Sequence, residues 1–171
     1  MINPKEIFTV GMILFAVIDI IGSVPIIIEL RKKVGHIQSE KASIVSVIIM
    51  IAFLFIGEEI LNIIGIDVNS FAVAGAFVIF FISLEMVLGI SIYKDETPET
   101  ASIVPIAFPL IAGAGTLTTI LSLRAIYSEI NILIGIVINL GFVYLVLKST
   151  GWLERKIGQS GFSILRRVFG I

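Results

Sequence analysis

The chain has 171 residues, of which 57% are hydrophobic and 15% are charged, with a mean hydropathy of +1.11 and a formal net charge of −1. A soluble domain needs more polar residues to cover its surface, so this composition places the chain among membrane proteins. No basic patch points to nucleic acid, and the lack of cysteine excludes disulfides, thiolate metal sites and thiol nucleophiles.

Five apolar runs are long enough to cross a membrane, since a spanning helix needs about 20 mostly apolar residues. In chain order they are Ile7–Ile28, Ser43–Ile64, Asn69–Ile92, Ala101–Leu123 and Ile130–Ser149. The loops between them are short, so we predict an all-α, polytopic transmembrane helix bundle that forms a single integral membrane domain over residues 1–171. A sixth run begins near Gly161, but the residues from there to Ile171 are too few to span. We expect either a half-helix there or a natural chain that continues past Ile171.

The first run contains "FAVIDIIGSVPIII", which combines residues that a spanning helix tolerates poorly. Asp19 lies near the middle of the run, where a carboxylate costs roughly 2.5–3.5 kcal/mol or more. Gly22 and Pro25 disfavour a helix, so we predict a break around Ile21–Val24, with Asp19 one turn before it. Backbone freed at membrane depth must be satisfied by protein or water. These residues, with Ser23, therefore predict a polar site for a cation, a proton or a substrate ammonium. The alternatives are a plain proline kink and a carboxyl that only bonds a neighbouring helix.

The second and third runs carry acidic residues near their C-terminal ends. Glu58 and Glu59 are adjacent, and adjacent helix positions point about 100° apart, so at most one faces the bundle. Glu85 lies near the end of the third run. Each acid is either solvated at the interface or acts as a gate or proton relay, and we retain Glu58 and Glu85 as candidates for the second role.

The fourth run, "VPIAFPLIAGAGTLTT", again places breakers and hydroxyls inside an apolar segment. Its "GAGT" stretch resembles a backbone nest whose N–H groups attract a carboxylate, and Thr116 is placed to cap a second half-helix. The alternative is close helix packing through small residues. An amino acid needs one site for its ammonium and one for its carboxylate, which Asp19 and Gly113–Thr116 can supply. The second half-site is predicted to comprise Pro109, Gly113, Gly115, Thr116, Thr118 and Thr119.

The fifth run holds Asn139 at mid-span, where an amide either bonds across helices or contacts a substrate. His36 has no second His and no Cys beside it in a ligand pattern, so we predict no metal site and no cofactor other than a coupling proton or sodium ion. The runs contain no Ser–His pair and no GxGD protease motif, so we expect a protein that is not an enzyme.

Lys and Arg alternate between successive loops. Odd-numbered loops carry ten of them, whereas the even-numbered loops and the N-terminus carry two. The positive-inside rule then predicts an N-terminus outside and basic loops in the cytoplasm. The first run is too long for a signal-peptide core and lacks a cleavage site, so we predict a multi-pass protein of the cell (inner) membrane.

A faint internal repeat relates the first run to the fourth, because both place Gly, Pro and hydroxyl residues in mid-span. If runs one to three and four to six are the units, each has an odd number of spans and the second is inverted. Inverted repeats with interrupted helices at matching positions are typical of transporters and place the site at the bilayer midplane.

These motifs resemble the MarC family of multi-pass membrane proteins, which is related to SnatA-type small neutral amino acid transporters. "DIIGSVPII" is similar to the family's "DPxGNxPxF" at Asp19, Gly22 and Pro25. "VPIAFPLIAGAGTLTT" is similar to "PLAxPxxAGPGxITT", and the matching residues are Pro105, Pro109, Gly113, Gly115, Thr118 and Thr119. Ile20 and Ala114 stand where the family usually has Pro, and Ser23 where Asn is common, which implies gentler breaks and a hydroxyl contact. The resemblance implies six spans.

Together these features predict a secondary transporter of small neutral amino acids such as glycine or alanine, driven by a proton or sodium gradient. Its expected partners are the lipid bilayer and the substrate, and the sequence is compatible with both a monomer and an oligomer. One alternative is a non-transporting stress or assembly factor in the membrane. The other is an intramembrane enzyme that uses Asp19 and Glu85 as a carboxylate pair.

Overall fold

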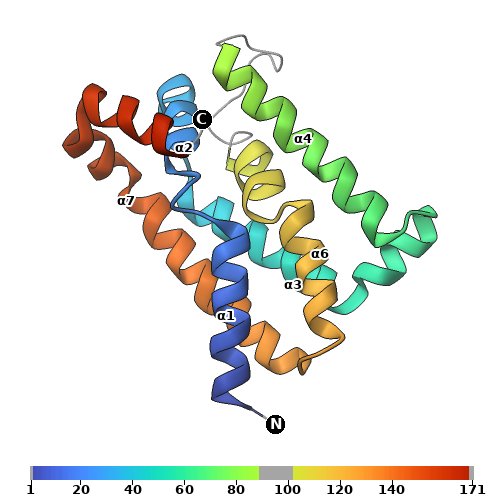
Figure 1. Ribbon diagram of the computed structural model, residues 1–171. Helices are drawn as coiled ribbons and strands as arrows, with labels where there is room; N and C mark the ends of the chain where they lie inside the picture. The colour runs from blue at the N-terminus through green and yellow to red at the C-terminus, as the bar shows by residue number, and fades with distance from the viewer. Residues whose placement is uncertain (1, 89–101, 170–171) are drawn as a thin grey trace.

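The computed structural model describes the backbone of residues 2–88 and 102–169. Its helical segments are α1 (Pro4–Ile18), α2 (Val24–Val34), α3 (Ser39–Ile64), α4 (Val68–Leu88), η1 (Ser102–Ile111), α6 (Ala114–Arg124) and α7 (Glu129–Phe169). No strand occurs in these two described ranges, which confirms the all-α prediction (Figure 1).

Four of the five predicted runs fall into two kinds, and the third run lies in α4, whose Val68–Phe77 part is a shorter apolar helix. Two helices, Ser39–Ile64 and Glu129–Leu153, are each long and apolar enough to cross a membrane. η1 and α6 together make a third candidate span that is bent by 46° at the break between them. The first run is likewise divided into α1 and α2, with Asp19–Ser23 between them. The first and fourth runs are therefore interrupted, as their breakers predict.

The end of the chain differs from the sequence prediction. We expected a loop after Ser149 and a new run near Gly161, but α7 continues without interruption to Phe169. The segment "WLERKI" explains the error, because it is made mostly of good helix formers and contains no proline. Figure 1 shows the last part of α7, in red, turning back towards α2.

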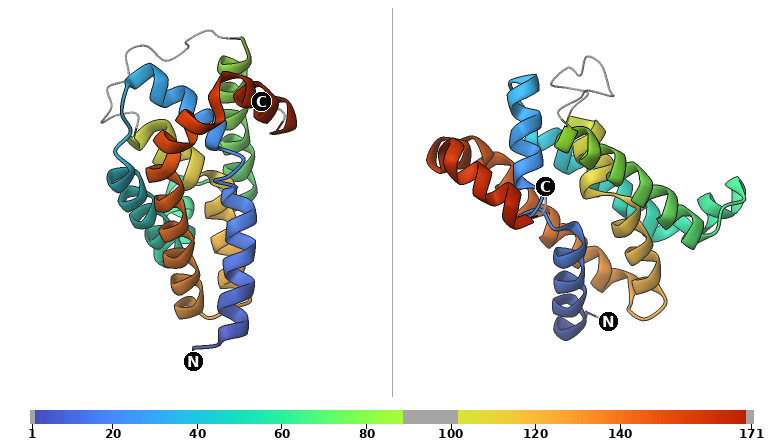
Figure 2. Two further views of the ribbon diagram at one scale, coloured as in Figure 1. Left: turned by 90° about the vertical axis from the view of Figure 1, so that its left-hand side faces the viewer. Right: turned by 45° about the horizontal axis from the view of Figure 1, so that its top comes forward.

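The bundle has two distinct ends. The start of α1 lies beside the start of α7, where the Asn3 N–H donates to Oδ1 of Asn131 over 3.1 Å. At the opposite end, Arg31 of α2 lies over α7 and its Nη1 is 3.4 Å from Oγ1 of Thr150. We call this second end the basic end because it carries Arg31, Lys32, Lys33, Lys41 and Lys148. Both helix breaks lie between these ends in Figure 1 and in the left view of Figure 2.

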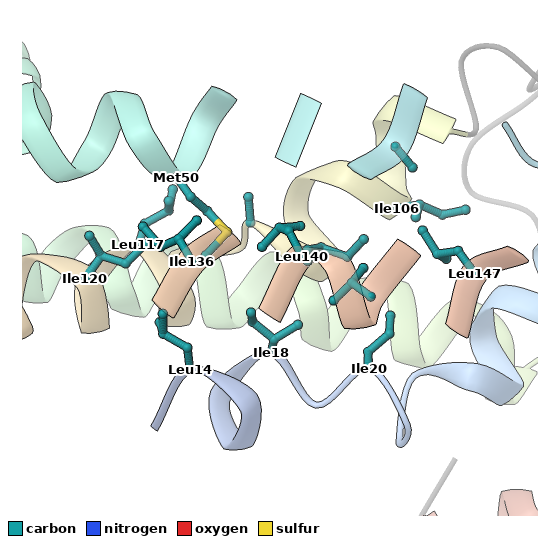
Figure 3. Close-up of a cluster of buried hydrophobic side chains, with 14 of the residues drawn as sticks. Leu14, Ile18, Ile20, Met50, Ile106, Leu117, Ile120, Ile136, Leu140 and Leu147 are labelled. Carbon is teal, nitrogen blue, oxygen red and sulfur yellow. The ribbon is translucent and has the colours of Figure 1, made fainter. Parts of the chain in front are cut away.

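One apolar core joins the two broken segments to α3 and α7. α7 supplies Ile136, Leu140 and Leu147, which are at most 2% exposed. Figure 3 shows these side chains between residues of the first broken segment and residues of the second. The other labelled members are Leu14, Ile18, Ile20, Met50, Ile106, Leu117 and Ile120. Lipid tails are as apolar as these side chains, so close van der Waals packing rather than water exclusion holds this core together. Both breaks are therefore held against the same core.

Candidate functional site

The first break begins at Asp19. α1 ends at Ile18 because Asp19 takes a left-handed conformation, with φ 41° and ψ 52°. Among the described residues it is the one non-glycine residue with a positive φ. Aspartate tolerates this region better than most residues, yet still at a cost. The prediction that Asp19 precedes the break by a turn is wrong, because Asp19 is the first residue of the break.

The Asp19 carboxylate is held by the backbone that follows it. The Gly22 N–H donates to Oδ1 of Asp19 over 3.1 Å, and the Ser23 N–H donates to the Asp19 carbonyl over 3.0 Å. A side chain at position 22 would collide with this carboxylate, because a Cβ there would lie 2.8 Å from Cγ of Asp19. The Asp19–Gly22 spacing is thus a geometric requirement of this turn.

The carboxylate also opposes the dipole of its own helix. The C-terminal end of a helix carries a partial negative charge, so an anion there is unfavourable. The Asp19 residue is nonetheless exposed at the end of α1 and is held in a costly backbone conformation. An observed outlier of this kind is a reason to infer function, although the bond from the Gly22 N–H offsets part of its cost.

Freed backbone carbonyls lie next to this carboxylate. Within the described part of the chain, nothing donates a hydrogen bond to the carbonyl oxygens of Ala16, Val17 or Ile18. These are the last carbonyls of α1, which a continuing helix would have satisfied. Together with Asp19 they form a region of negative potential that favours a cation or an ammonium group.

Pro25 begins the second half of the segment. It lies in the first turn of α2, where its missing N–H removes no helical hydrogen bond. Pro25 therefore favours the start of a new helix after the break and does not kink a continuous helix. Ser23 is the residue before α2, and its side chain accepts no hydrogen bond from the first N–H groups of α2.

The second break arises from two prolines and a glycine. Val104 and Phe108, each directly before a proline, have extended backbone inside η1. The residue before proline is sterically disfavoured in the helical region, which explains both positions. Gly113 then adopts an extended conformation, with φ −79° and ψ 172°, and α6 starts at Ala114. Pro109 is buried within this irregular segment.

The start of α6 presents N–H groups without partners. In the described chain, the N–H groups of Gly113, Ala114, Gly115 and Thr116 donate to no other group, and no side chain caps them. We expected Thr116 to cap this end, but its hydroxyl donates back across the break to the Ile111 carbonyl over 2.9 Å. The capping prediction is wrong, because the Thr116 hydroxyl points towards η1, where it donates to Ile111, and accepts no hydrogen bond from the first N–H groups of α6. The helix end therefore remains uncapped, with Gly113, Ala114 and Thr116 buried, and its free N–H groups favour an anion.

The next two threonines satisfy backbone within α6. The hydroxyls of Thr118 and Thr119 both donate to the Gly115 carbonyl, over 3.1 Å and 2.7 Å. Each is partly buried. Their hydroxyl oxygens keep lone pairs that can accept a hydrogen bond, so these residues line the first turn of α6 without closing its N-terminus.

The last turn of α1 lies beside the first turn of α6. A Cβ on Gly115 would lie 4.0 Å from Cγ1 of Val17, so the first turn of α6 faces the last turn of α1. From the other side, Gly75 of α4 packs so closely on Ala114 that its Cβ would clash there. The carbonyl end of α1, with Asp19 beyond it, thus adjoins the N–H end of α6.

Three further predicted residues lie elsewhere. Asn139 is buried in α7, and its Nδ2 donates to the Gly11 carbonyl over 3.0 Å and to the Gly135 carbonyl over 2.9 Å. This amide therefore joins α1 to α7. Glu58 is exposed on α3. Glu85 belongs to the helical backbone of α4, but its side chain lies outside the described residues.

Sequence reasoning missed the carbonyls of Ala16, Val17 and Ile18 and the close approach of Gly75. The carbonyls become free only because Asp19 ends the helix early, and nothing in the side-chain pattern reports that event. Gly75 had a weak signal as a glycine inside an apolar run. No group of three His, Cys, Asp or Glu residues that could hold a metal ion occurs in the described ranges.

Comparison with known proteins gives a consistent match over almost the whole chain. The family described as MarC family integral membrane protein matches residues 4–171. A UPF0056 membrane protein of Methanocaldococcus jannaschii is 32% identical, with 92% of this chain and 85% of the relative covered. The protein YvbG of Bacillus subtilis, also named a UPF0056 membrane protein, is 31% identical, with 92% and 83% covered. No solved structure matches the chain.

Proposed function

The chain belongs to the MarC family of integral membrane proteins, and we propose that it acts there as a secondary transporter of small neutral amino acids such as glycine or alanine. One observation supports the proposal: the carbonyl end of α1, which Asp19 follows, lies against the first turn of α6, whose N–H groups are free. An amino acid zwitterion has the complementary charges at its two ends.

The proposed site holds each end of the substrate at a different break. Its ammonium group lies against the Asp19 carboxylate and the last carbonyls of α1. Its carboxylate accepts hydrogen bonds from the first turn of α6, where the helix dipole favours an anion. The contact of Gly115 with Val17 supports selection for a small side chain, because the two helix ends leave little width between them.

The proposed mechanism couples this site to an ion gradient. A proton on Asp19, or a sodium ion held by Asp19 and the freed carbonyls, balances the negative potential at the end of α1. Interrupted helices of this kind are used by transporters whose two repeats rock about a central site. The proposal includes the inverted repeat that the sequence predicts, in which η1 and α6 would correspond to α1 and α2. The proposal includes no enzymatic step and no cofactor beyond the coupling ion.

The proposed orientation follows the distribution of charge. The basic end faces the cytoplasm and the N-terminus faces outside, in a cell membrane. Arg31, Lys32 and Lys33 in the last turn of α2 also lie at a helix C-terminus, where positive charge is favourable.

Uptake into liposomes tests the proposal. Wild-type protein is reconstituted, and accumulation of radiolabelled glycine or alanine is followed under an imposed proton or sodium gradient. We expect gradient-driven uptake that Asp19→Asn abolishes, since Asn keeps the left-handed conformation but cannot carry the charge. Glu59→Gln, which neutralises an exposed carboxylate on α3, is the matched control and should leave uptake unchanged. Equal uptake by wild type and Asp19→Asn would remove Asp19 from the coupling role, and no uptake under either gradient would overturn the proposal.

A further inference from the structure

Four buried serines gather where α3 meets η1. Ser39, Ser43 and Ser46 of α3 are 6%, 7% and 0% exposed, and Ser102 of η1 is 0% exposed. At 100° per residue, the three α3 serines point within about 60° of one another, so they share one face. We call Ser39, Ser43 and Ser46 the serine face.

Two hydrogen bonds attach η1 to α3, one on each side of Ser43. Near the basic end, the Gln38 N–H donates to Oγ of Ser102 over 2.9 Å. Further along, Oγ of Ser46 donates to the Ala42 carbonyl over 2.8 Å and lies 3.4 Å from the Ala107 carbonyl. The second contact to η1 is long for a hydrogen bond and therefore weak. Ser43 lies between these two points of attachment.

Ser43 is the exception in this interface. Its Oγ is buried and has no hydrogen-bond partner, the one such side-chain atom in the described residues. A serine inside a helix ordinarily donates to the carbonyl four residues earlier, as Ser46 does. A buried polar atom without a partner costs free energy, so each one requires an explanation. A polar group that enters this interface would supply the missing partner.

The polar character of this face stops at mid-depth. Met50 and Leu54 continue the same face of α3 and are both fully buried and apolar. In Figure 3, Met50 lies beside Leu117 and Ile136. The hydroxyl-bearing part thus extends from the basic end to the level of Ala107, five residues before Ala112 at the second break.

We propose that the serine face and η1 line the route by which a small neutral amino acid passes between the basic end and the second break, with Ser43 as a hydroxyl that the solute contacts on the way. The identity of the solute rests on the function proposed above. η1 is suited to move relative to α3, because its extended residues Val104 and Phe108 interrupt its helical hydrogen bonding and the Ser46–Ala107 contact is long. The apolar continuation at Met50 keeps the route closed towards the other end.

Thiol accessibility tests this route directly, because the natural chain has no cysteine. Ser43→Cys and Ser46→Cys are compared with Met50→Cys and Leu54→Cys, which lie on the same face beyond the polar part. Membranes are treated from the basic end with a charged, membrane-impermeant methanethiosulfonate, with and without alanine. We expect labelling of the two serine variants but not of the two controls, and loss of that labelling when alanine is present.

The contrary results are equally definite. Labelling of Ser43→Cys no faster than that of Met50→Cys would overturn the route, and labelling that alanine does not reduce would overturn its assignment to this solute. Because Ser43 makes no hydrogen bond, Ser43→Ala should keep the Tm of wild type, and a large fall in Tm would show a structural role instead. These measurements need no gradient, so they fail independently of the uptake by wild type and Asp19→Asn that tests the transport function.

Discussion

The turn between Asp19 and Gly22 offers the sharpest test of whether the position of the carboxylate matters. Gly22→Ala adds one methyl group at a buried position whose backbone is outside the left-handed region, so alanine fits the backbone. The methyl carbon would lie 2.8 Å from Cγ and 2.9 Å from Oδ1 of Asp19, tighter than ordinary contact at 3.4–4 Å. The substitution therefore displaces the carboxylate and leaves its charge intact.

The expected effects of Gly22→Ala on stability and on uptake follow from this geometry. Moving Cγ from 2.8 Å to ordinary contact requires a shift of about 0.6 Å, which disrupts the bond from the Gly22 N–H. Loss of that bond costs about 1 kcal/mol of folding free energy, since Asp19 is exposed. The smaller entropy of the unfolded alanine chain offsets about 0.4–1 kcal/mol of it. Stability should thus change little, whereas uptake should fall about tenfold, because misplacing a binding group by 1 Å can cost 100-fold.

The assay combines thermal unfolding in detergent with uptake of radiolabelled alanine into liposomes. Gly141→Ala is the control, because a Cβ at Gly141 in α7 meets nothing within 4 Å. It should be neutral or stabilising by about 0.5–1 kcal/mol and should leave uptake unchanged. Wild-type uptake by Gly22→Ala, with unchanged dependence on Asp19, would refute the argument that the turn positions the carboxylate.

Three further predictions concern hydrogen bonds at the second break, between α1 and α7, and at the start of α4. Thr116→Val should lower stability by about 1 kcal/mol, because the Ile111 carbonyl loses its donor, and Thr116→Ser should restore it in thermal unfolding. Asn139→Leu should cost about 1–2 kcal/mol in the same assay, since its amide bonds both α1 and α7; an unchanged Tm would contradict this. At the start of α4, hydrogen bonds from the Ser70 hydroxyl and backbone N–H groups lower the pKa of Asp67 below its ordinary value of 3.8. The stabilisation of the start of α4 by the Asp67 carboxylate is therefore fully present above pH 3.8. It is lost as the pH falls through the lower pKa that Asp67 has in the folded protein. Hydrogen exchange of the first amides of α4 should accelerate there in wild type, but show no such transition in Asp67→Asn.

The positions of the spans and the existence of both breaks could be predicted because they depend on local chemistry. The length of an apolar run indicates a spanning helix, and proline and glycine change the backbone conformation of their immediate neighbours. The pairs Val104–Pro105 and Phe108–Pro109 illustrate this, since each proline moves the residue before it out of the helical region. The two full spans, Ser39–Ile64 and Glu129–Leu153, and the two interruptions followed from such rules alone.

The details of the site depend on conformations that several helices decide together. Asp19 ends α1 by taking a left-handed φ, which its residue type permits but does not require. The Thr116 hydroxyl can serve either as an acceptor for its helix end or as a donor to η1, and the packing at the break selects the second. The partners of Asn139 became evident only when α1 was placed against α7. The continuation of α7 past Ser149 shows the reverse case, in which propensity was a better guide than the loss of hydrophobicity.

Equilibrium binding of radiolabelled alanine to purified protein tests the central claim that the two breaks form one site. We expect saturable binding by wild type and its loss in Asp19→Asn. We also expect weak competition by alaninol, which lacks the carboxylate, and by propionate, which lacks the ammonium, because each retains only one of the two contacts. Binding by Asp19→Asn as tight as that of wild type, or competition by propionate as strong as that by alanine, would contradict the two-ended site.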